Sequence, residues 1–142
     1  MRYLGIDYGD KHIGLAIGDD DSKLALPLIT LVNAGAETLC SDISRVCSQE
    51  NIDTLVIGVP GMGSVFVDQR KKIESVVYLL RRQVSAPVMT VDESFTSREA
   101  RHLIHEQGKR VGESTDEHAL AAMLILQSYF DKSQPSTLNP LP

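Results

Sequence analysis

Apolar runs separated by short polar turns open the chain, and apolar residues at helical spacing follow them. Residues 2–8 and 12–18 are two such runs around a polar turn, a pattern that predicts a β-hairpin. A third strand is predicted over residues 24–32, where Pro27 favours an edge position because proline cannot donate a ladder hydrogen bond. The chain is therefore expected to begin as an antiparallel meander of three strands.

Helix and strand patterns alternate after the meander. The predicted elements are helices over residues 36–51, 67–84, 96–107 and 116–130, and strands over residues 53–59 and 87–93. This order predicts an α/β fold with a central mixed five-stranded sheet. The antiparallel meander supplies three of its strands, two parallel strands complete it, and helices flank it.

Length and composition are those of a single globular domain. The chain has 142 residues, of which 42% are hydrophobic and 23% are charged. We predict one domain over residues 1–131. The tail, residues 132–142, holds three prolines and is expected to be flexible.

The charge balance excludes an overall basic nucleic-acid clamp. Fourteen Lys and Arg residues stand against 19 Asp and Glu residues, which gives a net charge of −5. Nucleic acid remains a candidate partner, because enzymes that bind phosphate through metal ions concentrate acids. No signal peptide or membrane span is apparent, so a cytoplasmic location without a membrane partner is expected.

The two cysteines, Cys40 and Cys47, fall on one predicted helix. Seven residues at a helical rise place them roughly 10 Å apart, too far for a disulfide. We expect reduced thiols that share the core-facing side of that helix.

Two carboxylates stand at the ends of predicted strands. Asp7 interrupts an apolar run, and Glu93 closes the strand over residues 87–93. Sites in α/β sheets form at the carboxyl ends of the parallel strands, where two acids make a hard-cation site for Mg²⁺ or Mn²⁺. The alternative for Asp7 is a cap of the turn at Gly9. The alternative for Asp92 and Glu93 is a favourable interaction with the dipole of the next helix.

Four segments in order and register resemble the YqgF/RuvX family of pre-16S rRNA nucleases, which are also described as Holliday-junction resolvase-like. They are residues 7–16, 56–60, 92–100 and 121–130. The resemblance implies an RNase H-like fold and divalent-metal-dependent hydrolysis of phosphodiesters. It also implies that Asp7 and Glu93 are metal-binding acids.

The chain departs from the family pattern at three positions. His12 and Ser94 each stand where the family usually has Arg, and His118 stands where it has its third aspartate. Two alternatives remain for the third ligand. His118 can ligate through a neutral imidazole, which suits Mn²⁺ or Zn²⁺ better than Mg²⁺. Alternatively, a helix that starts at Glu117 leaves Asp116 at a cap position from which its carboxylate could reach inward.

The predicted function is metal-dependent cleavage of structured RNA, with the 5′ end of pre-16S rRNA as substrate and Mg²⁺ or Mn²⁺ as cofactor. The catalytic candidates are Asp7, Glu93, Asp116 and His118. The metal ligands among them are Asp7, Glu93 and His118. The candidates for phosphate contacts, each equally compatible with a plain surface position, are Lys11, His12, Arg98 and Arg101. The protein is expected to be a monomer or a homodimer.

Three other functions fit parts of the pattern. Cleavage of Holliday junctions or other branched DNA would use the same metal chemistry, and a two-fold dimer would favour it. A nucleic-acid-binding module that has lost its third acid would lack activity. A phosphate-binding lobe of the actin and sugar-kinase type also begins with Asp-x-Gly, but it needs a second lobe that 142 residues cannot supply.

Overall fold

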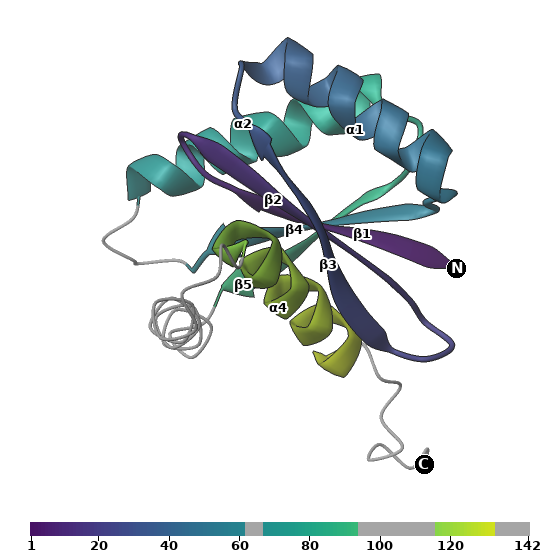
Figure 1. The fold of residues 1–142 in the computed structure, drawn as a ribbon. Coiled ribbons are helices and arrows are strands. Elements are labelled where there is room, and N and C mark those ends of the chain that lie inside the picture. The colour runs from purple at the N-terminus through teal and green to yellow at the C-terminus, as the bar shows by residue number, and fades with distance from the viewer. Residues whose placement is uncertain (62–66, 94–115, 133–142) are drawn as a thin grey trace, which may run out of the picture.

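The structure, a computed structural model, describes residues 1–61, 67–93 and 116–132 (Figure 1). Its strands are β1 (Arg2–Tyr8), β2 (His12–Asp19), β3 (Leu24–Val32), β4 (Thr54–Pro60) and β5 (Val88–Glu93). Its helices are α1 (Ala36–Glu50), α2 (Val67–Gln83) and α4 (Glu117–Lys132). The predicted helix over residues 96–107 lies outside the described residues. So does the predicted tail, apart from Lys132, which still belongs to α4.

The described strands form one five-stranded sheet in the order β3-β2-β1-β4-β5. β1, β2 and β3 pair antiparallel, while β4 pairs parallel with both β1 and β5. This confirms the predicted mixed sheet of a three-stranded meander and two parallel strands. β3 lies at an edge, as Pro27 indicated, and its register with β2 shifts between Leu15 and Ala16.

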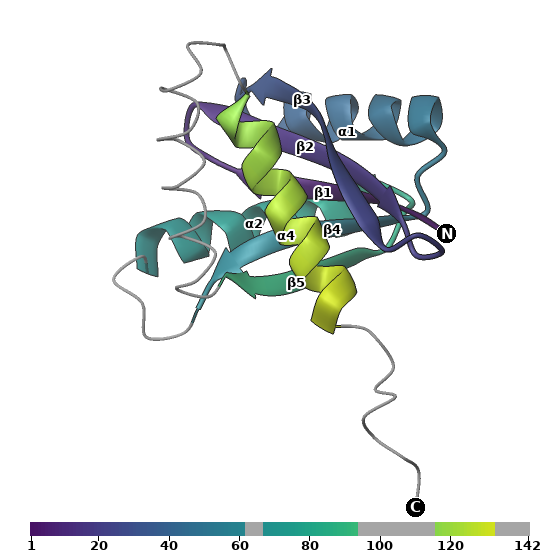
Figure 2. The same ribbon diagram turned by 60° about the horizontal axis from the view of Figure 1, so that its bottom comes forward.

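Helices cover both faces of the sheet, with α1 and α2 on one face and α4 on the other (Figures 1 and 2). Leu4 and Ile6 of β1 belong to the core under α1 and α2. Tyr3, by contrast, packs with Phe130 of α4, their ring centroids 5.3 Å apart. Because successive strand side chains point to opposite faces, Asp7 lies on the α4 face of β1.

Helix α4 packs closely against the centre of the sheet. A Cβ atom at Gly5 would lie 2.9 Å from the carbonyl oxygen of Ala122, so only glycine permits this approach. The small side chains of Ala119, Ala121 and Ala122 are buried, and Ala122 belongs to the core between α4 and the sheet. No helix in the described ranges is long and apolar enough to cross a membrane.

Both cysteines of α1 are free thiols, as predicted. Cys40 is buried and Cys47 is half-buried, and burial raises the pKa of each thiol.

Candidate active site

The start of α4 lies beside Asp7. Asp7 is half-buried and pairs across the ladder with Gly14 of β2. A Cβ atom at Gly14 would overlap the carbonyl oxygen of His118, so the first turn of α4 rests directly on this glycine. The sheet thus brings the candidate acid of β1 and the first turn of the last helix together at one rim.

Gly14→Ala is expected to destabilise the protein and to weaken activity. The added methyl group must push the first turn of α4 away from β2, and overpacking of this kind typically costs about 1–3 kcal/mol. Urea unfolding measures the loss of stability, and cleavage rates measured well below the unfolding transition show the effect on the site. Unchanged stability and rate in the Gly14→Ala variant would contradict the observed packing.

Asp116 caps helix α4. Its Oδ1 accepts hydrogen bonds from the Thr30 hydroxyl of β3 and from the Ala119 backbone N–H, the latter at 3.3 Å. The first backbone bond of the helix, from Leu120 N–H to Asp116 O, is 3.0 Å long. The helix therefore begins at Glu117, which is the start that the Asp116 alternative for the third metal ligand requires. The carboxylate of Asp116, however, is engaged by β3 and by the cap.

The cap predicts a difference between two substitutions. Asp116→Ala is expected to lower the free energy of unfolding by about 1 kcal/mol, whereas Asp116→Asn keeps an acceptor and should cost much less. Urea unfolding measures both. Cleavage rates of the Asp116→Asn variant then distinguish a helix cap from a metal ligand, because a metal ligand needs the negative charge that asparagine lacks. We expect the rate to stay within a few-fold of wild type.

His12 and His118, which both depart from the family pattern, are in contact with each other. The His118 ring stacks on His12, at the start of β2, with centroids 4.8 Å apart and planes inclined by 26°. The His118 side chain is 37% exposed, and its Nε2 lies 3.9 Å from Oε1 of Glu117. The two substituted positions thus form one imidazole pair at the rim.

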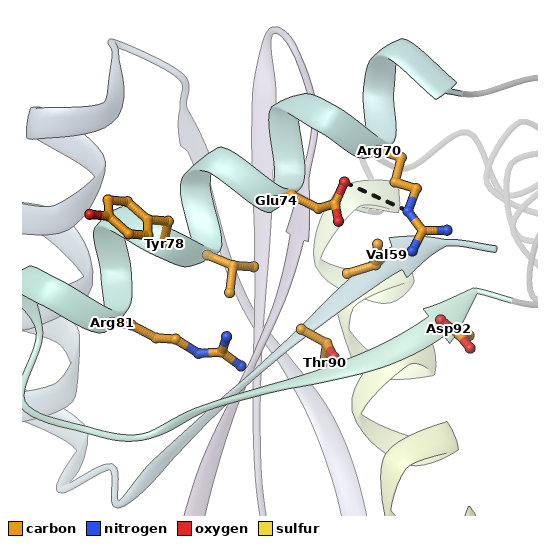
Figure 3. Close-up of a pocket in the computed structure, with 8 residues that line it drawn as sticks. Val59, Arg70, Glu74, Tyr78, Arg81, Thr90 and Asp92 are labelled. Atoms are coloured by element: carbon orange, nitrogen blue, oxygen red, sulfur yellow. Dashed lines mark ion pairs between the residues drawn. The ribbon is translucent and has the colours of Figure 1, made fainter. Parts of the chain in front are cut away.

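Glu93 is the last residue of β5 and pairs with Pro60 at the end of β4. Its side chain lies outside the described residues, but strand alternation assigns position 93 to the face of Val91, which packs in the core under α4. That is also the face of Asp7. Asp92 lies on the opposite face, where it lines a groove beside α2 (Figure 3). The register therefore favours Glu93 over Asp92 as the partner of Asp7.

The donor set suits a hard divalent cation only in part. Carboxylate oxygens at Asp7 and Glu93 are ligands of the kind that Mg²⁺ and Mn²⁺ take. Among the side chains that the structure describes, no three His, Cys, Asp or Glu groups lie close enough to hold an ion. Because the Glu93 side chain is not among them, a complete site would need that residue together with Asp7.

The turn between β1 and β2 is held from two sides. Asn33 donates to the Gly9 carbonyl at 2.9 Å, and Lys72 of α2 forms an ion pair with Asp10 at 3.2 Å. Lys11, a predicted phosphate contact, is exposed in this turn. Two other predicted phosphate contacts, Arg98 and Arg101, lie outside the described residues.

Sequence reasoning missed two residues near the rim. Thr30, the partner of Asp116, carries no local pattern that distinguishes it within an apolar strand. Arg70 stands among basic residues of the kind that usually form a solvated helix face, yet its side chain is only 23% exposed and lines a groove beside α2.

The fold is that of the RNase H-like resolvases. The structure matches Thermus thermophilus RuvC in complex with a Holliday junction substrate at a TM-score of 0.60 and 14% identity, covering 93% of this chain and 95% of that chain. It matches the Fowlpox virus resolvase in complex with Holliday junction DNA at a TM-score of 0.56 and 15% identity, covering 93% and 98%.

The chain belongs to the RuvX family, whose model, described as Holliday junction resolvase, matches residues 1–132. Two relatives carry the name "Putative pre-16S rRNA nuclease". The one from Opitutus terrae is 37% identical over 141 residues, covering 97% of both chains. The one from Dictyoglomus turgidum is 33% identical over 133 residues, covering 92% of this chain and 94% of the relative. The resemblance and the fold predicted from the sequence are thereby confirmed.

Proposed function

We propose that this protein is a divalent-metal-dependent nuclease of the cytoplasm that hydrolyses phosphodiester bonds of structured RNA, with the 5′ end of pre-16S rRNA as its substrate. Membership of the RuvX family and the names of its relatives support this class of reaction. One observation carries the proposal. Asp7 and the position of Glu93 occupy the same face at one rim of the sheet, beside the start of α4.

In this proposal, Asp7 and Glu93 hold Mg²⁺ or Mn²⁺. When bound there, such an ion would supply an activated water and would neutralise the charge that develops on the phosphate. His118 is the favoured third ligand, because the carboxylate of Asp116 is already bound to Thr30 and to the helix cap. Lys11, His12, Arg98 and Arg101 are assigned to phosphate contacts, which orient the scissile bond.

Cleavage of end-labelled pre-16S rRNA tests the proposal. The purified protein is incubated with the RNA in Mg²⁺, in Mn²⁺ or in EDTA. We expect discrete products near the mature 5′ end with either metal and none in EDTA. Intact RNA under all three conditions, with the protein still bound to it, would instead indicate a nucleic-acid-binding module without activity.

Branched DNA is the second candidate substrate, because the matching family model is described as a Holliday junction resolvase. A resolvase must cut two symmetric strands, so a stable two-fold dimer would favour this function. A four-way junction in the same assay, together with the mass of the protein in solution, separates the two candidates. Faster cleavage of the junction than of the RNA by a dimer would replace RNA with DNA as the proposed substrate.

A further inference from the structure

A second candidate binding site lies on the face of the sheet opposite to α4. Helix α2 and the edge strand β5 enclose a groove of about 400 Å³ (Figure 3). Val59 and Val77 contribute apolar surface to it, and its charged lining consists of Arg70, Glu74 and Arg81 of α2 and Asp92 of β5. Asp7 lies on the other face, so this groove is distinct from the candidate active site.

Arg70 has an unsatisfied donor at this groove. Its Nε lies 3.7 Å from Oε1 of Glu74, a single long contact rather than a two-point ion pair. Its Nη1 is shielded from solvent and has no hydrogen-bond partner among the described residues. A buried charged donor without an acceptor is costly, and a phosphate oxygen is the acceptor that a guanidinium fits best.

Helix α2 is basic although the chain is acidic. It carries five basic residues and two acids, a net charge of +3, in a chain with a net charge of −5. At the far end of the groove Arg81 is fixed by a 2.9 Å hydrogen bond from Nη2 to the carbonyl oxygen of Val88. Arg70 and Arg81 are eleven residues apart, about 16 Å along a helix. A polymeric anion can span that length, and a free phosphate cannot.

The Arg70 end of the groove belongs to the rim that carries the candidate active site. Gln69, the residue before Arg70, donates to the carbonyl oxygen of Tyr8 at 3.4 Å. Close by on the same helix, Lys72 pairs with Asp10 of the turn between β1 and β2. A nucleic-acid strand that leaves the rim and passes around β5, the edge of the sheet, would therefore reach Arg70 first and Arg81 last.

We infer that this groove binds the phosphodiester backbone of the nucleic-acid strand that extends from the cleaved bond. The Arg70 guanidinium donates to one phosphate oxygen, and Arg81 provides a second positive charge along the strand. The inference rests on the proposed function, since it takes the ligand to be the substrate held at the rim.

Binding of fluorescein-labelled single-stranded RNA, followed by fluorescence anisotropy in EDTA, tests the inference without cleavage. Arg70→Gln is compared with Lys71→Gln, which removes the same charge from an exposed neighbour outside the groove. We expect Arg70→Gln to weaken binding at least about fivefold and to reduce the slope of log K against log salt by about 1, as loss of one phosphate contact does. Lys71→Gln should change the affinity less than about twofold, because exposed charges are screened by salt.

Glu74→Gln is expected to change the RNA affinity in the direction opposite to Arg70→Gln. It removes a negative charge from the groove and releases Nε of Arg70, so RNA should bind more tightly. Weaker or unchanged binding would overturn the inference, and this variant carries the test if Arg70→Gln fails to fold. Equal weakening by Arg70→Gln and Lys71→Gln would also overturn it. If the protein cleaves RNA with Mg²⁺ but the two variants weaken binding equally, the inference about the groove is wrong and the proposed function stands. The absence of metal-dependent cleavage defeats the proposed function instead.

Discussion

Asp7→Asn is expected to reduce metal-dependent cleavage by at least about a hundredfold, by analogy with the loss of a charged transition-state stabiliser. The substitution keeps the shape of the side chain and removes the anion that binds the ion. The fold should survive, because asparagine has nearly the same shape as aspartate and Asp7 is only half-buried. Single-turnover cleavage rates give the effect, and urea unfolding checks that the Asp7→Asn variant is folded.

Asp10→Asn is the matched control for this experiment. It makes the same chemical change three residues further along, at an exposed side chain whose ion pair is with Lys72 of α2. Exposed ion pairs contribute little, so we expect nearly wild-type cleavage and stability. Undiminished metal-dependent turnover of the Asp7→Asn variant would refute the assignment of Asp7.

His118→Asp is expected to keep or improve cleavage supported by Mg²⁺, and His118→Ala to weaken cleavage. The imidazole stands where relatives are expected to have an aspartate and brings no negative charge, which disfavours Mg²⁺ relative to Mn²⁺. The measurement is the cleavage rate as a function of Mg²⁺ and of Mn²⁺ concentration. Aspartate should shift the half-saturating Mg²⁺ concentration downward, and alanine should raise that of Mn²⁺.

His12→Ala separates ligation from stacking. It removes the ring on which His118 packs and leaves the imidazole of His118 in place. If His118 binds the ion, the ratio of Mn²⁺-supported to Mg²⁺-supported rates should be preserved in the His12→Ala variant and lost in the His118→Ala variant. An inert His118→Ala substitution would defeat the assignment of His118 as the third ligand.

The sheet could be predicted from the sequence because its determinants are local. Two apolar runs around a polar turn predict the hairpin, and Pro27 marks the edge strand from its missing N–H alone. The alternation of side chains along a strand then places Asp7, since the faces of Leu4 and Tyr3 decide its own face once the helices are in position.

Contacts between distant segments could not be predicted in this way. The bond between Thr30 and Asp116 joins residues 86 positions apart. The stacking of His12 on His118 likewise depends on how α4 crosses the sheet, which no local spacing specifies. The partial burial of Arg70 is not predictable for a related reason. Helical periodicity places a residue on a face but does not say how a long side chain lies along its neighbours.

Metal binding at the Asp7 rim underlies the proposed chemistry, and paramagnetic broadening of backbone amide signals by Mn²⁺ detects it without any substrate. Addition of Mn²⁺ to the ¹⁵N-labelled protein should broaden the signals of Asp7, Gly14 and Ala119 first, and Asp7→Asn should abolish this pattern. The acidic turn at Asp19–Asp21, at the other end of β2, serves as an internal comparison. Broadening centred on that turn, or broadening at the rim that persists in the Asp7→Asn variant, would contradict a metal site at Asp7.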